Sequence, residues 1–391
     1  MPENNVIIFS WNLPRGGLPK VILKEYYYFR EKNKVTTILT FEPPKGAYEQ
    51  ELSETELKVL KPNKMNKLKN RNVSVFFPGI NIAIRGGLLI NMILLTRYLK
   101  KENPSVVIAH QLLSAIFVTP YCLMYRKPFI LILHDNPFLF LEKNDHSRVG
   151  PLKIMLFNLT YMMSNLVIYK SRQTISTTIQ IYDAIKKKLL FRKDIVVAEY
   201  GIDSSKESDI GKRKLLLTVS KWSKFRNPQA YVELLNFLTQ NINLTMVGRW
   251  DSDAELSEFV DFVKRQGLSH RVKIMVDVSE DELSKLYDET RVFLRLGFGE
   301  SGTGQAILEA LGHGCPVVIS KDLGASTMIE DGKQGFLVDE NDLSVVANKI
   351  SMIFNDDDLL RSMVRESYDL SKRKSWNSYL EALFKAAMDL F

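Results

Sequence analysis

The sequence contains very little cysteine: only Cys122 and Cys315 occur among its 391 residues, and they stand far apart in unlike contexts. Two isolated cysteines cannot build a disulfide framework or a zinc site with closely spaced cysteine ligands. The composition therefore excludes small disulfide-stapled and zinc-stapled folds, and it predicts a protein of a reducing compartment.

The chain also lacks a long uninterrupted apolar segment. The longest nearly apolar stretch, residues 105–125, contains His110, Ser114 and Pro120. Because a membrane-spanning helix needs about 20 predominantly apolar residues, we interpret this stretch as a buried strand followed by a helix. The first ten residues, MPENNVIIFS, lead directly into an expected strand and show no signal-peptide pattern. We therefore expect a cytoplasmic protein.

Two common nucleotide-binding motifs are missing. Gly16 and Gly17 follow the expected strand 6–10, but they form no G-x-G-x-x-G motif and no acidic residue follows at the ribose position. Residues 299–306, GESGTGQA, have the glycine spacing of a phosphate-binding Walker A loop. Gln305 and Ala306 replace its lysine and its hydroxyl residue, so we exclude a P-loop NTPase.

The overall composition is that of a soluble globular protein, with 45% hydrophobic and 25% charged residues, and the length suits two domains. The net charge is +8, which is compatible with a nucleic acid, an anionic membrane surface or a phosphorylated substrate. Aromatic and basic residues are not interleaved as they are in proteins that bind single-stranded nucleic acid. The net charge is then the only feature that favours a nucleic-acid partner, and we expect none.

Short β-rich runs alternate with helix-length segments in both halves of the chain. This alternation predicts α/β domains in which parallel sheets are joined by helical crossovers. In the first half we expect helices over residues 82–100, 152–163 and 173–190, and a strand over 166–169. In the second half we expect strands over residues 214–219, 244–247 and 272–276, and a helix over 253–266.

One block, residues 291–320, combines a strand, a glycine-rich loop, a helix and a second strand. Its sequence is RVFLRLGFGESGTGQAILEALGHGCPVVIS, with Glu300 in the loop and Glu309 in the helix. The block resembles the signature E-G-F-G-x-x-x-x-E-A-x-A-x-G-x-P-V-V of the family 4 retaining glycosyltransferases of GT-B fold. Eight residues separate the two glutamates where the pattern has seven, and counting back from Glu309 leads to Ser301. Glu309 is therefore the closer match.

Further segments carry the same resemblance. In SKWSKFRNP, Lys221 and Arg226 match the two cations of the family's G-R-x-x-x-x-K-G, with the two basic residue types exchanged. The strand PFILILHD places His134 where the family has a histidine beside the transferred sugar. Residues 200–203 resemble the strand exit before the interdomain linker. Thr327 stands where the family has a further glutamate, so no role is implied for it.

The resemblance implies a GT-B fold, with two Rossmann-like doubly wound domains facing a cleft. Residues 1–203 would bind the acceptor, residues 204–374 would hold a nucleotide-sugar donor, and a last helix within 375–391 would return to the first domain. The implied reaction transfers a hexose with retention of configuration, without a metal ion or other cofactor. Asp251-Ser252-Asp253 has the letters of a metal-binding motif, but we expect it to supply a helix cap.

The resemblance also implies roles for individual residues. The implied catalytic residues are His134 near the reacting carbon, Lys221 and Arg226 on the departing diphosphate, and Glu300 on the sugar. The implied donor-binding residues are Gly16, Gly17, Gly302, Thr303, Gly304 and Glu309, the last of these on the ribose hydroxyls.

Several alternatives remain open from the sequence. The glycines can form a tight turn, the cations a solvated loop, and His134 a structural contact. The enzyme can be a GT-B epimerase or phosphorylase, or the chain can be a non-catalytic module that binds nucleotide-sugars or glycans.

Charge suggests where the acceptor is located. Residues 58–71 contain six basic residues, residues 97–101 three and residues 186–193 five, all in the expected acceptor domain. We expect peripheral attachment to the cytoplasmic face of a membrane and a glycan or lipid-linked acceptor. A solvated basic surface that only keeps the protein soluble is the alternative.

Overall fold

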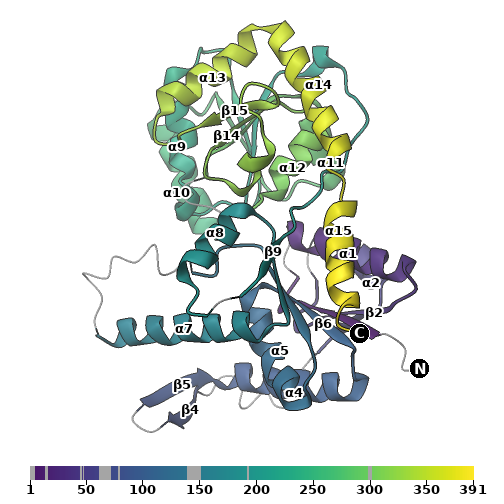
Figure 1. Cartoon of the computed structure of the whole chain (residues 1–391). Helices are drawn as coiled ribbons and strands as arrows, with labels where there is room; N and C mark the ends of the chain where they lie inside the picture. The colour runs from purple at the N-terminus through teal and green to yellow at the C-terminus, as the bar shows by residue number, and fades with distance from the viewer. Residues whose placement is uncertain are drawn as a thin grey trace. The chain divides into compact units, whose positions relative to one another are not determined.

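The computed structural model describes residues 5–13, 16–44, 46, 48–60, 72–77, 80–138, 151–191, 193–297 and 302–391. The chain forms two compact units (Figure 1). Unit 1 comprises Met1–Thr177, Ile181–Ala198 and Leu380–Phe391, and unit 2 comprises Thr178–Gln180 and Glu199–Tyr379.

Unit 1 is built on a parallel sheet with the strand order β3-β2-β1-β6-β7-β8-β9. Its strands are β1 (Asn5–Phe9), β2 (Val35–Thr40), β3 (Leu57–Val59), β6 (Val106–His110), β7 (Phe129–Leu133), β8 (Gln173–Ser176) and β9 (Ile195–Val197). Its helices are α1 (Gly17–Glu31), α2 (Glu49–Ser53), α4 (Gly86–Glu102), α5 (Gln111–Tyr125), α7 (Pro151–Lys170), α8 (Ile179–Lys188) and the larger part of α15 (Asn377–Met388).

Apart from Asn5 at the start of β1 and His110 at the end of β6, the residues of the central strands β1, β6 and β7 are apolar, as expected where helices cover both faces of a sheet (Figure 1). Every residue of β6 and β7 is buried. One face packs against α4, α5, α7 and α8. On α15, Phe384 packs its ring on Tyr28 and Phe29 of α1, with centroid distances of 5.9 and 5.3 Å.

Three expectations for unit 1 are wrong. Residues 80–85 form strand β5, which pairs antiparallel with β4 (Asn72–Phe77), so the helix expected from residue 82 begins only at Gly86. The strand expected over 166–169 is the last turn of α7, where the outer two residues are exposed and the inner two are buried, as on a helix. Residues 173–176, expected as helix, form β8, which pairs with β7.

Unit 2 is built on a second parallel sheet with the order β12-β11-β10-β13-β14-β15. Its strands are β10 (Leu215–Val219), β11 (Leu244–Val247), β12 (Val272–Met275), β13 (Thr290–Arg295), β14 (Val317–Ser320) and β15 (Gly335–Val338). Its α-helices are α9 (Pro228–Glu233), α10 (Asp253–Arg265), α11 (Glu280–Asp288), α12 (Gln305–Gly312), α13 (Leu343–Asn355) and α14 (Asp357–Arg373). Short 3-10 helices are η2 (Ile210–Lys212), η3 (Lys224–Arg226), η4 (Leu234–Phe237) and η5 (Gly324–Met328).

Both sheets have the doubly wound topology, which confirms the prediction of two Rossmann-like domains. In unit 1 the strand order reverses between β1 and β6, and in unit 2 it reverses between β10 and β13. Ligands of such sheets bind outside the carboxyl ends of the strands at this reversal. The loops that follow these strands are therefore where a site is expected. Within the described ranges, no helix has both the length and the apolar character needed to cross a bilayer.

Candidate functional site

In unit 2, the loop after β10 is fixed to the sheet by a buried tryptophan. Trp222 is fully buried, and its Nε1–H donates to the carbonyl oxygen of Val247 at 3.0 Å. Its backbone N–H donates to the carbonyl of Arg249, at the exit of β11. Gly248 allows this approach, since its φ is +132° and a Cβ there would lie 1.7 Å from the carbonyl oxygen of Ser220. The two loops thus leave the sheet in contact.

The fixed loop carries the two cations that the sequence selects. Lys221 is exposed, and its Nζ lies 2.7 Å from Oδ1 of Asp251. Arg226 ends η3 and is half-buried. Ser252 caps α10 by accepting a hydrogen bond from the N–H of Glu255, so the expected helix cap at Asp251-Ser252-Asp253 is confirmed.

The neighbouring strand β13 leads into the glycine-rich loop and α12. Gly304 is the N-cap of α12 and makes no side-chain cap hydrogen bond, while Thr303 is buried. The hydroxyl of the buried Tyr231 connects this exit to α9, since it accepts from the N–H of Leu296 at 2.8 Å. Gly302, Thr303 and Gly304 immediately precede α12 in the segment that connects β13 to this helix. Glu300 lies outside the described residues.

Glu309 lies on the second turn of α12 and is half-buried. The hydroxyl of Tyr287, on α11, donates to its Oε2 at 3.2 Å. Tyr287 also stacks on His313, whose Nδ1 lies 2.8 Å from Oδ1 of Asp288. These contacts hold the carboxylate of Glu309 in a fixed direction.

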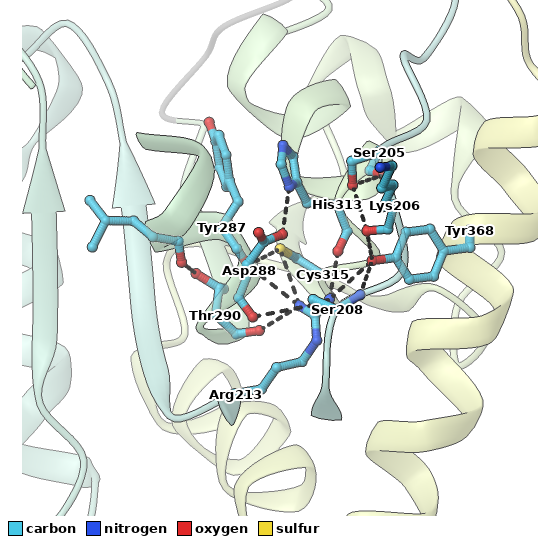
Figure 2. A network of polar contacts seen from close by, with 12 residues as sticks. Ser205, Lys206, Ser208, Arg213, Tyr287, Asp288, Thr290, His313, Cys315 and Tyr368 are labelled. Atoms are coloured by element: carbon cyan, nitrogen blue, oxygen red, sulfur yellow. Dashed lines mark hydrogen bonds and ion pairs between the residues drawn. The ribbon is translucent and has the colours of Figure 1, made fainter. Parts of the chain in front are cut away.

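A buried arginine connects the elements behind this part of the site (Figure 2). The guanidinium of Arg213 donates to the backbone carbonyls of Thr290 at 2.9 Å and His313 at 2.6 Å. It also donates to the hydroxyl of Ser208 at 2.7 Å. Arg213 therefore ties the starts of β10 and β13 to the end of α12. Its charge gave no hint of this in the sequence, because a lone arginine before a strand is usually exposed.

In unit 1, Gly16 precedes α1 and caps it without a side-chain hydrogen bond. Its φ is +143°, which favours glycine, and a Cβ there would meet no atom of the described residues within 4 Å other than those of its chain neighbours. Gly17 is the first residue of α1, so both glycines lie where the connection from β1 enters this helix.

His134 follows β7 and is hydrogen-bonded to the end of the adjacent strand β6. Its Nε2 lies 2.9 Å from Nδ1 of His110, and the two rings are parallel within 5°. Nε2 of His110 lies 2.9 Å from Oε2 of Glu25 on α1, and His110 and Glu25 are fully buried. Desolvation, and after it the neighbouring His110, hold the pKa of His134 well below its ordinary value. His134 is therefore neutral at neutral pH.

The sequence did not single out Glu25. It occupies the apolar stripe of α1, four residues after Val21 and four before Phe29, which are both buried. A glutamate in such a stripe is the signal that could have found it.

Neither thiol is a candidate nucleophile. Burial raises the pKa of both Cys122 and Cys315 to about 12, so both remain protonated and unreactive at neutral pH. Among the described residues, no group of three or more histidine, cysteine, aspartate or glutamate side chains is arranged to hold a metal ion.

The structure thus gathers the selected residues at two sheet edges. Lys221, Arg226, Gly302, Thr303, Gly304 and Glu309 belong to unit 2 and surround the ends of β10 and β13; Gly16, Gly17 and His134 belong to unit 1 and surround the ends of β1, β6 and β7.

Comparison with known proteins assigns the chain to a family. Residues 202–370 match the family model Glycosyl transferases group 1, and residues 16–206 match Glycosyltransferase Family 4. This chain belongs to glycosyltransferase family 4. The resemblance stated from its motifs is thereby confirmed.

The curated relatives of this family 4 chain are distant in sequence. N-acetyl-alpha-D-glucosaminyl L-malate synthase of Bacillus anthracis is 25% identical over 212 residues, which are 52% of each chain. D-inositol 3-phosphate glycosyltransferase of Corynebacterium jeikeium is 28% identical over 184 residues, which are 45% of this chain and 44% of the relative. The chain spans about half the length of the curated relatives it matches.

A solved structure matches the family 4 chain over nearly its whole length. Anabaena HepE, in complex with UDP and glucose, superposes with a TM-score of 0.76 at 15% identity, covering 98% of this chain and 99% of HepE. Likeness at this identity is one of fold, and it confirms the GT-B architecture.

Proposed function

We propose that this family 4 chain is a retaining glycosyltransferase that moves a hexose from a nucleotide-sugar donor to an acceptor. One observation carries the proposal: the loops after the adjacent strands β10 and β13 bring Lys221, Arg226 and the N-terminus of α12 to one sheet edge. Cations and helix N–H groups both favour phosphate, and the departing nucleoside diphosphate carries two phosphates. That HepE was solved with UDP and glucose supports a nucleotide-sugar as the donor.

The remaining residues take roles around this diphosphate position. Glu309, oriented by Tyr287, accepts hydrogen bonds from the ribose hydroxyls. Glu300 binds the sugar, and Gly302, Thr303 and Gly304 line the donor site. His134 contacts the sugar near the reacting carbon, and Gly16 and Gly17 line the phosphate from unit 1.

We further propose that the charges of Lys221 and Arg226 take the place of a metal ion in stabilising the leaving group. Turnover should then survive an excess of EDTA. Complete loss of turnover that Mn²⁺ restores would contradict this part of the proposal.

The acceptor is proposed to be a glycan or a lipid-linked molecule, reached by peripheral attachment to an anionic membrane. Unit 1 exposes apolar side chains on α7 and on the loop after α8, which we call the α7–α8 surface. Its members are Met162, Leu166, Tyr169, Leu190 and Phe191, each more than a third exposed. Tyr169 and Phe191 pack at 5.1 Å, and Asn165 Oδ1 accepts from the N–H of Leu190, so helix and loop form one surface.

Basic residues border the α7–α8 surface. Lys186, Lys187 and Lys188 form the last turn of α8, and Lys170 ends α7 with its Nζ 5.5 Å from the ring centre of Tyr169. Apolar side chains surrounded by lysines suit the interface of an anionic leaflet, where each basic residue contributes about 1 kcal/mol. Of the three basic segments expected from the sequence, residues 61–71 lie outside the described residues.

A panel of nucleotide-sugars incubated with the full chain tests the proposed reaction, with release of the nucleoside diphosphate as the readout. Acceptor-dependent release from one donor, and a product whose anomeric configuration by NMR matches the donor, would support a retaining transferase. Interconversion of the donor without release would indicate an epimerase, and sugar release that requires free phosphate would indicate a phosphorylase. Binding without any conversion would indicate a non-catalytic module.

A further inference from the structure

Hydrogen bonds join three titratable side chains of unit 1, namely Glu25, His110 and His134. Glu25 comes from α1, His110 from the end of β6, and His134 from the residue after β7. Oε2 of Glu25 lies 2.9 Å from Nε2 of His110, and Nδ1 of His110 lies 2.9 Å from Nε2 of His134. The side chains of Glu25 and His110 are completely buried.

The chemistry of these groups orders their protons. A carboxylate only accepts hydrogen bonds, so Nε2 of His110 must carry a proton toward Glu25. In a neutral imidazole the other nitrogen then bears a lone pair, and Nδ1 of His110 accepts from Nε2–H of His134. By the same argument Nδ1 of His134 bears a lone pair. The carboxylate of Glu25 therefore determines, through His110, which nitrogen of His134 is the acceptor.

We propose that Glu25 and His110 are positioning residues that fix the tautomer and the ring orientation of His134, leaving its Nδ1 as a hydrogen-bond acceptor. An acceptor nitrogen pairs with a group that donates, such as a sugar hydroxyl, and disfavours a phosphate oxygen. The inference rests on the proposed function, in which His134 contacts the sugar, and it adds the two residues that fix the tautomer of this histidine.

Packing alone does not explain Glu25. Its neighbours in the apolar stripe of α1, including Val21, Ile22 and Phe29, are buried. A leucine would fill this stripe without desolvating a charge, whereas a buried carboxylate must be stabilised by its partners. In catalytic triads a buried carboxylate fixes the tautomer and the orientation of the histidine to which it is hydrogen-bonded. Here Glu25 is hydrogen-bonded to His110 and acts on His134 through it.

The tautomer can be read directly from ¹⁵N NMR of ring nitrogens, because the chain has only five histidines. At pH 8 in histidine-labelled full chain, we expect His134 as the Nε2–H form, with its signals assigned by H134N. Glu25→Leu, which suits the apolar stripe, should give a mixture of tautomers at His134. Glu25→Gln keeps an accepting oxygen and should restore much of the wild-type pattern. Glu31→Leu, an exposed position on the same helix, is the matched control and should leave the signals unchanged.

Kinetics supply a second readout. Glu25→Leu should lower kcat by about tenfold or more with little change in KM for the nucleotide-sugar, and Glu25→Gln should recover part of the loss. In an H134N background Glu25→Leu should cause no further loss, because it acts through His134.

Three results would overturn the inference: an Nδ1–H tautomer of His134 in the wild-type chain, unchanged His134 signals in Glu25→Leu, or an equal loss of kcat with and without His134. The NMR arm needs no turnover. If the wild-type chain transfers no sugar, the proposed function fails while the spectra still decide the tautomer.

Discussion

Lys221, Lys224 and Arg226 lie within one short loop but have different partners. Lys221 pairs with Asp251 and Lys224 pairs with Glu258, both on the surface, whereas Arg226 is half-buried. If Lys221 and Arg226 hold the departing diphosphate, replacing either with alanine should lower kcat by about 10²–10³, because a preorganised charge is lost in the transition state. Steady-state kinetics measure the effect, and thermal unfolding checks that the variants fold.

Lys224→Ala is the matched control, because it removes from the same loop a cation to which no role is assigned. We expect it to retain nearly full activity. Wild-type turnover by a folded Arg226→Ala protein would rule out the assignment of Arg226.

The lowered pKa of His134 predicts how the stability of the chain depends on pH. Below a pH of about 6.5, the unfolded chain binds a proton at this residue that the folded chain does not bind. The free energy of unfolding should therefore fall as the pH drops from about 6.5 toward the lowered pKa, by up to about 1.4 kcal/mol for each pH unit. Above a pH of about 6.5, protonation of His134 should not change the free energy of unfolding.

Urea titrations at several pH values between 5 and 8 measure this slope. His134→Asn should flatten it, whereas His270→Asn, at an exposed histidine, should not. Parallel curves for wild type and His134→Asn would show that His134 does not carry the effect.

At the residue level, the sequence predicted the ends of strands well and buried charges poorly. His134 and Lys221 follow apolar runs that are strands, so their place at a sheet edge could be predicted from the chain. Glu25 and Arg213 could not be found in this way, because their function depends on partners that lie far away in the sequence. Arg213, for example, bonds to a carbonyl at residue 313.

At the level of elements, Arg213 joins β10, β13, α12 and α14, since its guanidinium also lies 3.5 Å from the hydroxyl of Tyr368. Arg213→Met fills similar space but leaves buried carbonyls without their donor. Each such group costs about 1–3 kcal/mol, so the free energy of unfolding should fall by about 3 kcal/mol or more. Urea unfolding of the full chain gives the value. Lys212→Met, at the exposed neighbouring position, should change it by less than about 0.5 kcal/mol, and equal effects of the two substitutions would remove the special role of Arg213.

Elements of unit 2 were predicted almost to the residue, whereas three segments of unit 1 were not. The strand β11 was expected over residues 244–247 and occupies them. Around α7 and β8, by contrast, a four-residue apolar run ends a helix and a polar run, Gln173–Ser176, forms a strand. Short runs suit either structure, and residues 173–176 are a strand because they pair with β7, a partner about 40 residues earlier that local sequence patterns do not indicate.

At the level of the whole molecule, a net charge of +8 and the α7–α8 surface predict binding to anionic vesicles. The double variant Leu190→Ser/Phe191→Ser should reduce sedimentation with phosphatidylglycerol liposomes severalfold, because two exposed apolar anchors are lost. Added salt should also release the wild-type chain.

Phe237→Ser is the control for this experiment, since Phe237 is a similarly exposed phenylalanine of unit 2. It should leave vesicle binding unchanged. If the wild-type chain stays in the supernatant at low salt, membrane attachment is wrong and the transferase proposal is unaffected.

The last stretch of the chain, Leu380–Phe391, belongs to the unit that the first residues begin. A ribosome therefore completes the sequence of unit 2 before it supplies the segment that packs Phe384 against Tyr28 and Phe29. Until that segment is made, the surface of α1 that α15 covers is open to solvent, whereas the sequence of unit 2 is already complete. Unit 1 is thus the first unit to be started and the last to be completed during synthesis. Its nascent amino-terminal part is the part that a chaperone would have to protect.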